Sequence, residues 1–338
     1  MKLVSAAQMR ELDRRTIEEL GTPADDLMDW AGQGVADVVR RMTEVAGFFS
    51  PHIHLFAGRG NNGGDAFAAA RHLKDMGFSV EVWLAGAANE VQGDALKHLS
   101  RMKTAGIELR ELPTKEDWED ARASRESADI LVDGILGTGS AGPARGPAVG
   151  AIQYINALSQ DALVVAIDIP SGLDADTGAA EGDVVRADVT ATMGLPKLGL
   201  VEPAALDYVG CIEVIDIGIP DDFVAQVPAA SDRELIYLPD LKPLFKRRPR
   251  ASHKGNYGHV LLIGGARGYA GAIALAARAA MRSGAGLVTA LVPSSVAGIV
   301  AGASLETMVH GGRKPISARC RPTPGAPGKT ASAISTPS

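Results

Sequence analysis

Short apolar runs alternate with amphipathic stretches through most of the first 225 residues of this 338-residue chain. Each run suits one buried strand, and the stretches between the runs have the spacing of helices. Strands that alternate with helices in this way predict a doubly wound, mostly parallel α/β sheet with helices on both faces. The runs expected to form strands are residues 53–57, 80–84, 107–109, 129–133, 162–168, 189–193 and 212–215.

The composition agrees with a buried parallel sheet and excludes several classes of partner. Hydrophobic residues make up 46% of the chain and aromatic residues only 4%, so the core must be mainly aliphatic. A formal net charge of −6 argues against nucleic acid or an anionic membrane as the main partner. The two cysteines, Cys211 and Cys320, are too few for a disulfide framework or a metal cluster.

The N-terminal sequence lacks the apolar segment of a signal peptide, and no run in the chain approaches the length of a membrane span. Ser5 to Gln8 fits a capping box instead, which predicts an amphipathic helix that continues to Leu20. We therefore expect a cytoplasmic protein.

A glycine-rich segment follows the first expected strand and reads Gly58-Arg59-Gly60-Asn61-Asn62-Gly63-Gly64-Asp65. A helix is expected directly after it, over residues 66–76. Glycines at such a turn let the backbone approach a ligand closely, and the free N–H groups at a helix start attract phosphate. We interpret the segment as a ligand-binding turn, with a tight turn that binds nothing as the alternative.

Two further polar clusters follow apolar runs. Asp133 ends one run ahead of Gly137-Thr138-Gly139, and Asp168 ends another ahead of Ser171. A buried carboxylate costs several kcal/mol unless it is paired or binds a cation, although each Asp taken alone could simply cap the next turn. Because the carboxyl ends of parallel strands meet at one edge of a sheet, we expect all three clusters to converge. Their oxygen atoms suit K⁺, Na⁺ or Mg²⁺ and not zinc.

These motifs resemble those of the NAD(P)H-hydrate epimerases, the YjeF N-terminal domain family. The resemblance covers roughly residues 1–225 and implies a Rossmann-like domain. It also implies epimerisation of the R and S forms of hydrated NADH and NADPH, called NADHX and NADPHX, which carry a hydroxyl at C6 of the nicotinamide ring. The segments that carry it are Gly58–Asp65, Val132–Gly139, Asp168–Asp174, Ala187–Thr192 and Lys197–Leu200.

The resemblance also implies roles for particular residues. A potassium ion would be held by Asn62, Asp133 and Ser171, and Asp168 would act as the catalytic acid/base beside the nicotinamide ring. A homodimer is the implied assembly. The implied substrate-binding residues are Asn61, Asn62, Gly63, Gly64, Asp65, Gly137, Thr138, Gly139, Ser140, Ala141, Gly142, Pro143 and Asp168.

A second segment begins after a basic linker, which we place at residues 226–252. Residues 253–312 resemble the start of the ADP- or ATP-dependent NAD(P)H-hydrate dehydratase domain, which has a ribokinase-like α/β fold. In that domain Ala272 would lie beside the substrate. ADP or ATP would be a cofactor only if the domain were complete.

The resemblance stops near residues 305–309. The last segment, Arg313–Ser338, contains five basic residues, five prolines and no acidic residue, a composition that predicts a disordered tail. We therefore expect a truncated dehydratase domain without activity.

Two other classes of function remain open. The same pocket could belong to a non-catalytic module that binds a nucleotide or a protein partner. A nucleotide kinase is the other alternative, although the chain has no Gly-x-x-x-x-Gly-Lys-Ser/Thr phosphate loop.

Overall fold

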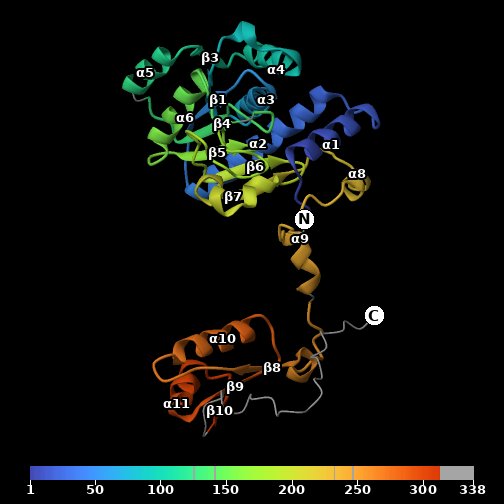
Figure 1. The fold of residues 1–338 in the computed structure, drawn as a ribbon, viewed down its shortest axis with the longest axis vertical. Coiled ribbons are helices and arrows are strands. Elements are labelled where there is room, and N and C mark those ends of the chain that lie inside the picture. The colour runs from blue at the N-terminus through green and yellow to red at the C-terminus, as the bar shows by residue number, and fades with distance from the viewer. Residues whose placement is uncertain (125, 141, 232, 246, 313–338) are drawn as a thin grey trace. The chain divides into compact units, whose positions relative to one another are not determined.

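The computed structural model describes residues 1–124, 126–140, 142–231, 233–245 and 247–312. The chain divides into two compact units, Met1–Pro243 and Leu244–Ser338, and each is described by itself (Figure 1). The division falls inside the linker predicted at residues 226–252. The tail predicted to be disordered, residues 313–338, lies outside the described residues.

The described part of the first unit contains a seven-stranded parallel sheet in the order β3-β2-β1-β4-β5-β6-β7. The order reverses between β1 and β4, which makes the sheet doubly wound. The predicted fold class is therefore confirmed, and every predicted strand is present. The strands are β1 (His52–Ala57), β2 (Ser79–Leu84), β3 (Glu108–Glu111), β4 (Ile130–Gly134), β5 (Leu163–Ile167), β6 (Val189–Met193) and β7 (Cys211–Ile215).

Helices cover both faces of this sheet (Figure 1). Leu55 of β1 packs in one apolar cluster with side chains of α1 to α4, whereas Phe56 packs in a second cluster with α5 and α6. Alternate residues of a strand point to opposite faces, so both faces of β1 are buried. The helices of the first unit are α1 (Ala6–Glu18), α2 (Ala24–Ala46), α3 (Asn61–Asp75), α4 (Gly93–Thr104), α5 (Lys115–Ser124), α6 (Pro147–Leu158), α7 (Leu206–Val209), α8 (Asp221–Gln226) and α9 (Leu238–Leu241).

Helix α3 begins earlier than predicted, with Gly60 as its N-cap. The prediction of a loop before a helix at 66–76 is therefore wrong, and residues 61–65 form the first helical turns. Their two glycines favour a loop by propensity, but packing overrides it. A Cβ at Gly63 would overlap the carbonyl oxygen of Gly58, and one at Gly64 would lie 2.5 Å from the sulfur of Met28. These two glycines thus serve close packing within the chain.

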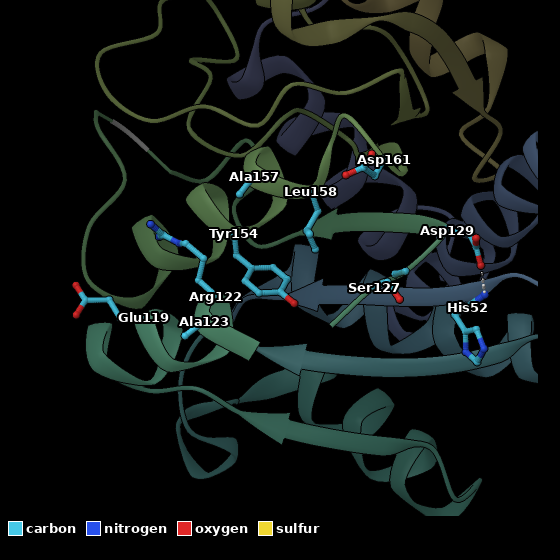
Figure 2. Close-up of a pocket in the computed structure, with 11 residues that line it drawn as sticks. His52, Glu119, Arg122, Ala123, Ser127, Asp129, Tyr154, Ala157, Leu158 and Asp161 are labelled. Carbon is cyan, nitrogen blue, oxygen red and sulfur yellow. Dashed lines mark hydrogen bonds between the residues drawn. The ribbon is translucent and has the colours of Figure 1, made fainter. Parts of the chain in front are cut away.

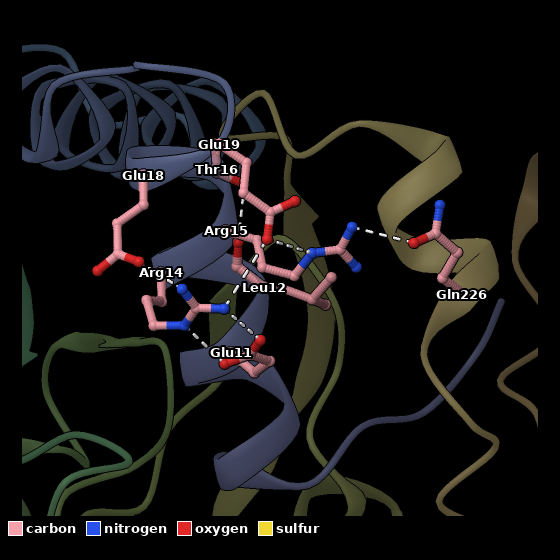
Figure 3. A network of polar contacts seen from close by, with 8 residues as sticks. All are labelled: Glu11, Leu12, Arg14, Arg15, Thr16, Glu18, Glu19 and Gln226. Atoms are coloured by element: carbon pink, nitrogen blue, oxygen red, sulfur yellow. Dashed lines mark hydrogen bonds and ion pairs between the residues drawn. The ribbon is translucent and has the colours of Figure 1, made fainter.

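Helix α1 carries the predicted capping box. The Gln8 backbone N–H donates to Ser5 Oγ at 3.2 Å, and the Ser5 N–H donates to Gln8 Oε1 at 3.0 Å. The outer side of the helix carries a network of charged residues that reaches α8 through Arg15, which donates to Gln226 Oε1 at 3.0 Å (Figure 3). Its inner side buries Leu12 completely. This orientation leaves the neighbouring Asp13 half-buried.

The second unit is smaller and contains a three-stranded parallel sheet in the order β10-β9-β8 within the described residues. This arrangement agrees with the predicted second α/β segment. None of the helices in the described parts of the chain is long and apolar enough to cross a membrane. The elements are β8 (His259–Ile263), α10 (Ala270–Arg282), β9 (Leu287–Pro293), α11 (Ser294–Ala303) and β10 (Met308–Gly312).

The crossing of α2 and α3 depends on Gly32. A Cβ at this position would lie 2.7 Å from the backbone nitrogen of Ala69. We expect Gly32→Ala to lower the free energy of unfolding by about 1–3 kcal/mol, because overpacking forces the two helices apart. Urea unfolding monitored by circular dichroism measures the change. The exposed neighbour Gln33 supplies the control, and Gln33→Ala should change stability by less than about 0.5 kcal/mol. Equal stability of both variants would contradict a tight crossing.

Candidate functional site at the carboxyl ends of β4 and β5

Asn62 ties the three polar clusters together. Its Nδ2 donates to the carbonyl oxygen of Leu136 at 2.9 Å and to that of Ile167 at 3.2 Å. The first carbonyl follows β4 and the second ends β5, so the first turn of α3 is held against both strand ends. Asn62 Oδ1 is buried and has no hydrogen-bond partner among the described residues.

Asp133 is fully buried at the end of β4 and joins the cluster of Ser171. Its Oδ1 accepts from Ser171 Oγ at 2.6 Å and from the Ile135 N–H at 3.2 Å, and its Oδ2 accepts from the Ser171 N–H at 2.8 Å. Burial raises the pKa of Asp133 to about 6, against the opposing effect of these hydrogen bonds. Asp133 therefore both caps its own turn and connects two clusters that lie far apart in the sequence.

Asp168 follows β5 in an unusual backbone conformation. Its φ of 65° is the only positive value of a non-glycine residue in the described part of the chain. Asp168 Oδ1 accepts from the Met193 N–H at 3.1 Å and from Thr192 Oγ1 at 3.2 Å, and it forms an ion pair with Lys197. Lys197 is completely buried, and no role was predicted for it, although it lies in one of the segments that carried the resemblance.

Two more carboxyl groups share this charged environment. Asp65 lies on α3, and burial together with the charges of Asp168 and Asp13 raises its pKa well above the usual value. Burial also raises the pKa of Asp13 to about 6, whereas Lys197 lowers it. Asp13 Oδ1 is buried without a hydrogen-bond partner among the described residues. Asp168 pairs with the Lys197 ammonium group, and Asp65 and Asp13 interact with its charge. The burial of Asp65 and Asp13 favours keeping a proton on these two carboxyls near neutral pH.

Sequence reasoning missed Asp13 because it searched the residues that follow strands. Asp13 lies in the middle of α1, a helix that precedes the sheet in the chain. One signal for Asp13 was available. It stands next to the apolar Leu12, on a helix whose other charged residues face outward.

The loop between β4 and α6 forms the second wall of the site. Arg10 of α1 donates to the carbonyl oxygen of Thr138 at 3.3 Å, Gly139 and Pro143 lie in the same loop, and Ala141 is outside the described residues. A hollow of about 210 Å³ opens here. It is lined by Leu136, Gly137, Ser140, Gly142, Gly172, Leu173, Asp174, Thr177, Ala179 and Glu181.

Two of the remaining predicted residues are exposed. Asn61 is exposed at the start of α3. Ala272 is exposed on α10 of the second unit and is described only within that unit.

A larger hollow of about 880 Å³ opens at the opposite edge of the sheet, where the strands begin (Figure 2). It contains none of the predicted site residues. Two of its charged groups already have partners: Arg122 donates to Gln153 Oε1 at 2.9 Å, and Asp129 Oδ2 accepts from the His52 N–H at 2.8 Å. Its remaining lining mixes acidic, neutral polar and apolar side chains, so it points to no particular ligand.

The raised pKa of Asp13 predicts a pH-dependent gain in stability for Asp13→Asn. Because the pKa in the fold (about 6) exceeds the usual 3.8, ionisation of Asp13 costs folding free energy as the pH rises through this interval. At pH 7 we expect the variant to be more stable by about 3 kcal/mol, and at about pH 3 or below the gain should vanish. Urea unfolding at both pH values measures it. Asp120→Asn, on an exposed position of α5, is the control and should show no such dependence.

Comparison with known proteins connects this site to a family. Residues 24–199 match the model described as YjeF-related protein N-terminus, and residues 260–324 match the model described as NAD(P)H-hydrate dehydratase. The crystal structure of the yeast protein YNL200c superposes with a TM-score of 0.53 and 25% identity, over 59% of this chain and 83% of that one.

Curated relatives extend the similarity beyond the first unit. The bifunctional NAD(P)H-hydrate repair enzyme Nnr of Moorella thermoacetica is 41% identical over 310 residues, which are 91% of this chain and 57% of the relative. Its namesake from Archaeoglobus fulgidus is 39% identical over 92% of this chain and 60% of the relative. The chain therefore spans a little over half the length of these relatives. Because the YjeF-related model covers more than half of the chain, the chain belongs to the YjeF-related N-terminal family, with a second region similar to NAD(P)H-hydrate dehydratase.

Proposed function

We propose that the first unit interconverts the R and S forms of NAD(P)H-hydrate. The observation that carries this proposal is the cluster of Asp168, Lys197, Asp65 and Asp13 at the carboxyl ends of the strands. In doubly wound sheets this edge is where ligands bind. The names of both relatives describe NAD(P)H-hydrate repair, which agrees with a hydrated nicotinamide nucleotide as the substrate.

The proposed chemistry needs a proton that can move. Inversion at C6 requires the C–O bond, or the ring, to open and to re-form from the other face. Asp168 is the proposed acid/base, which protonates the departing hydroxyl and takes a proton back when the bond re-forms. The neighbouring carboxyl groups of Asp65 and Asp13 keep a proton in the cluster near neutral pH, since burial raises both of their pKa values.

The first turn of α3 and the loop 137–143 are the proposed binding elements for the dinucleotide. Free backbone N–H groups at the start of a helix attract phosphate groups. A Cβ at Gly60 would meet no atom within 4 Å, so the backbone just ahead of α3 is open to a ligand. By contrast, Gly63 and Gly64 face the protein interior.

We further propose that Asn62, Asp133 and Ser171 hold a potassium ion. Their chemistry fits, because Asn62 Oδ1 is a buried oxygen without a partner and the buried Asp133 has hydrogen bonds but no cationic partner among the described residues. The described residues contain no group of three His, Cys, Asp or Glu side chains suited to a metal, so hard neutral oxygens must contribute. When bound, the ion would orient the substrate and balance the charge of Asp133.

For the second unit we propose that this chain has no dehydratase activity. Leu261 and Ile263 of β8 are 59% and 53% exposed, and Leu275 of α10 is 67% exposed. Apolar side chains of this size are normally covered in a working α/β domain. The described part of the unit therefore leaves apolar side chains uncovered, in contrast to a closed catalytic domain.

The decisive experiment is to incubate the purified chain with R-NADHX and to resolve both epimers by chromatography. We expect rapid equilibration, and no NADH on addition of ADP or ATP. Asp168→Asn should lower kcat at least about 100-fold, the size of a general acid/base contribution, while the variant remains folded at the assay temperature. NADH formation would refute the proposed loss of dehydratase activity. A folded wild-type chain without epimerisation would favour the non-catalytic binding module.

Potassium binding can be measured without the reaction. Because an ion that binds only the native state raises the melting temperature, KCl should raise it above that in tetramethylammonium chloride of equal ionic strength. We expect Asn62→Ala to abolish this difference, because it removes the unpartnered buried oxygen. Asn61→Ala, one residue earlier and exposed, is the matched control and should keep it. The same potassium-dependent shift in both variants would exclude Asn62 as a ligand.

A further inference from the structure

The ammonium group of Lys197 uses all of its hydrogen-bonding capacity inside the protein. It forms an ion pair with Asp168 Oδ1, and it donates to Met193 O at 2.9 Å and to Thr192 Oγ1 at 3.1 Å. An ammonium group has three donors, so these contacts saturate it. Its side chain is completely buried, which removes it from contact with solvent.

The fold holds Lys197 in place from the N-terminal segment. The Val4 N–H donates to Pro196 O at 3.1 Å, and the Leu198 N–H donates to Val4 O at 2.9 Å. The backbone on both sides of Lys197 is therefore paired with one residue that precedes α1. A buried charge is expensive, so a lysine kept this far inside must be matched by a fixed partner.

Only one of the two carboxylate oxygens of Asp168 has hydrogen-bond partners among the described residues. All three hydrogen bonds to the Asp168 carboxylate go to Oδ1, from Lys197, Thr192 and the Met193 N–H. Oδ2 has no partner among the described residues, and the side chain remains 14% exposed. The carboxylate is thus held by one oxygen while the other is available to a ligand.

We infer that Lys197 is a positioning residue, which orients Asp168 by binding one carboxylate oxygen and leaves the other oxygen to act on the substrate. The inference rests on the proposed epimerase function. Lys197 does not touch the substrate, because it is buried and its three donors are occupied. Its effect on the reaction therefore passes through Asp168.

The two remaining carboxyl groups complete this arrangement. Asp65 on α3 and Asp13 on α1 interact electrostatically with both Lys197 and Asp168. Burial raises the pKa values of these two carboxyls, which favours a proton on Asp65 or Asp13, beside Asp168.

A double-mutant cycle tests the inference. We expect Lys197→Met to lower kcat for R-NADHX epimerisation at least about 100-fold and to leave KM within about threefold, since substrate contacts are unchanged. In the Asp168→Asn background, adding Lys197→Met should cost less than about threefold, because residues that act as a unit are not additive. Lys103→Met, on an exposed position of α4, is the control and should keep wild-type kcat. If Lys197→Met lowered kcat by the same factor in the wild-type and Asp168→Asn backgrounds, the inference would be overturned. An unchanged kcat of the single variant Lys197→Met would overturn it as well.

Thr192→Val keeps the test usable if Lys197→Met does not fold. This variant removes a hydroxyl that contacts both Lys197 and Asp168, and it should lower kcat about tenfold with KM unchanged. If Thr192→Val kept the wild-type kcat, the hydrogen bonds to Asp168 Oδ1 would have no role in the reaction, and the inference would be overturned.

A readout without activity separates this inference from the proposed function. Lys197→Met and Asp168→Asn should each lower the melting temperature, and the double variant should lose less than the sum, because it leaves no unpaired buried charge. Lack of epimerisation by the wild-type chain would defeat the proposed function alone. Strictly additive melting temperatures would defeat the coupling of Lys197 to Asp168, whatever the activity.

Discussion

The close approach of α3 to the ends of β1 and β4 is the constraint on which the site depends. It is possible only because Gly58 and Gly63 carry no side chain where backbone meets backbone. The approach brings Asn62 within hydrogen-bonding distance of carbonyl groups that follow β4 and end β5. Asp65 lies near Asn62 at the start of α3. Fixing this part of the helix therefore also places Asp65 in the charged cluster. The glycine-rich motif is therefore a packing device first, and it positions the polar groups as a result.

The site requires charged groups to be buried away from water, which costs folding free energy. Asp133 and Lys197 are both fully buried, and each is surrounded by hydrogen-bonding partners in place of solvent. Interactions between such groups are stronger than on the surface, because the low dielectric of the interior screens them less. The same burial that costs stability therefore gives the carboxyl groups their raised pKa values. Buried carboxyl groups with raised pKa values are typical of sites that transfer protons.

Particular elements show how far the sequence could be read. The strands were predictable because buried parallel strands are short, continuous apolar runs such as that of β5. The start of α3 was not, because glycines argue against a helix by local propensity and the packing that overrides propensity is invisible in one segment. The 23-residue α2 (Ala24–Ala46) was also not predicted, although it packs against α3. In the candidate site, Asp133, Asp168 and Ser171 were predicted because they end or follow apolar strand segments, whereas Asp13 lies on a helix that is distant in the sequence from every strand.

The sequence by itself determined the α/β class, the strand segments and the family to which the motifs belong, because these depend on local apolar patterns and on contiguous residues. Only the tertiary structure decided that Lys197 and Asp13 join the cluster of Asp168. It also decided that one oxygen of Asp168 is saturated while the other is left without a partner among the described residues. The physical reason is that these contacts join groups from the N-terminal helix, the end of β5 and the segment after β6. Their interaction energies depend on distance and burial in space, which no local pattern encodes.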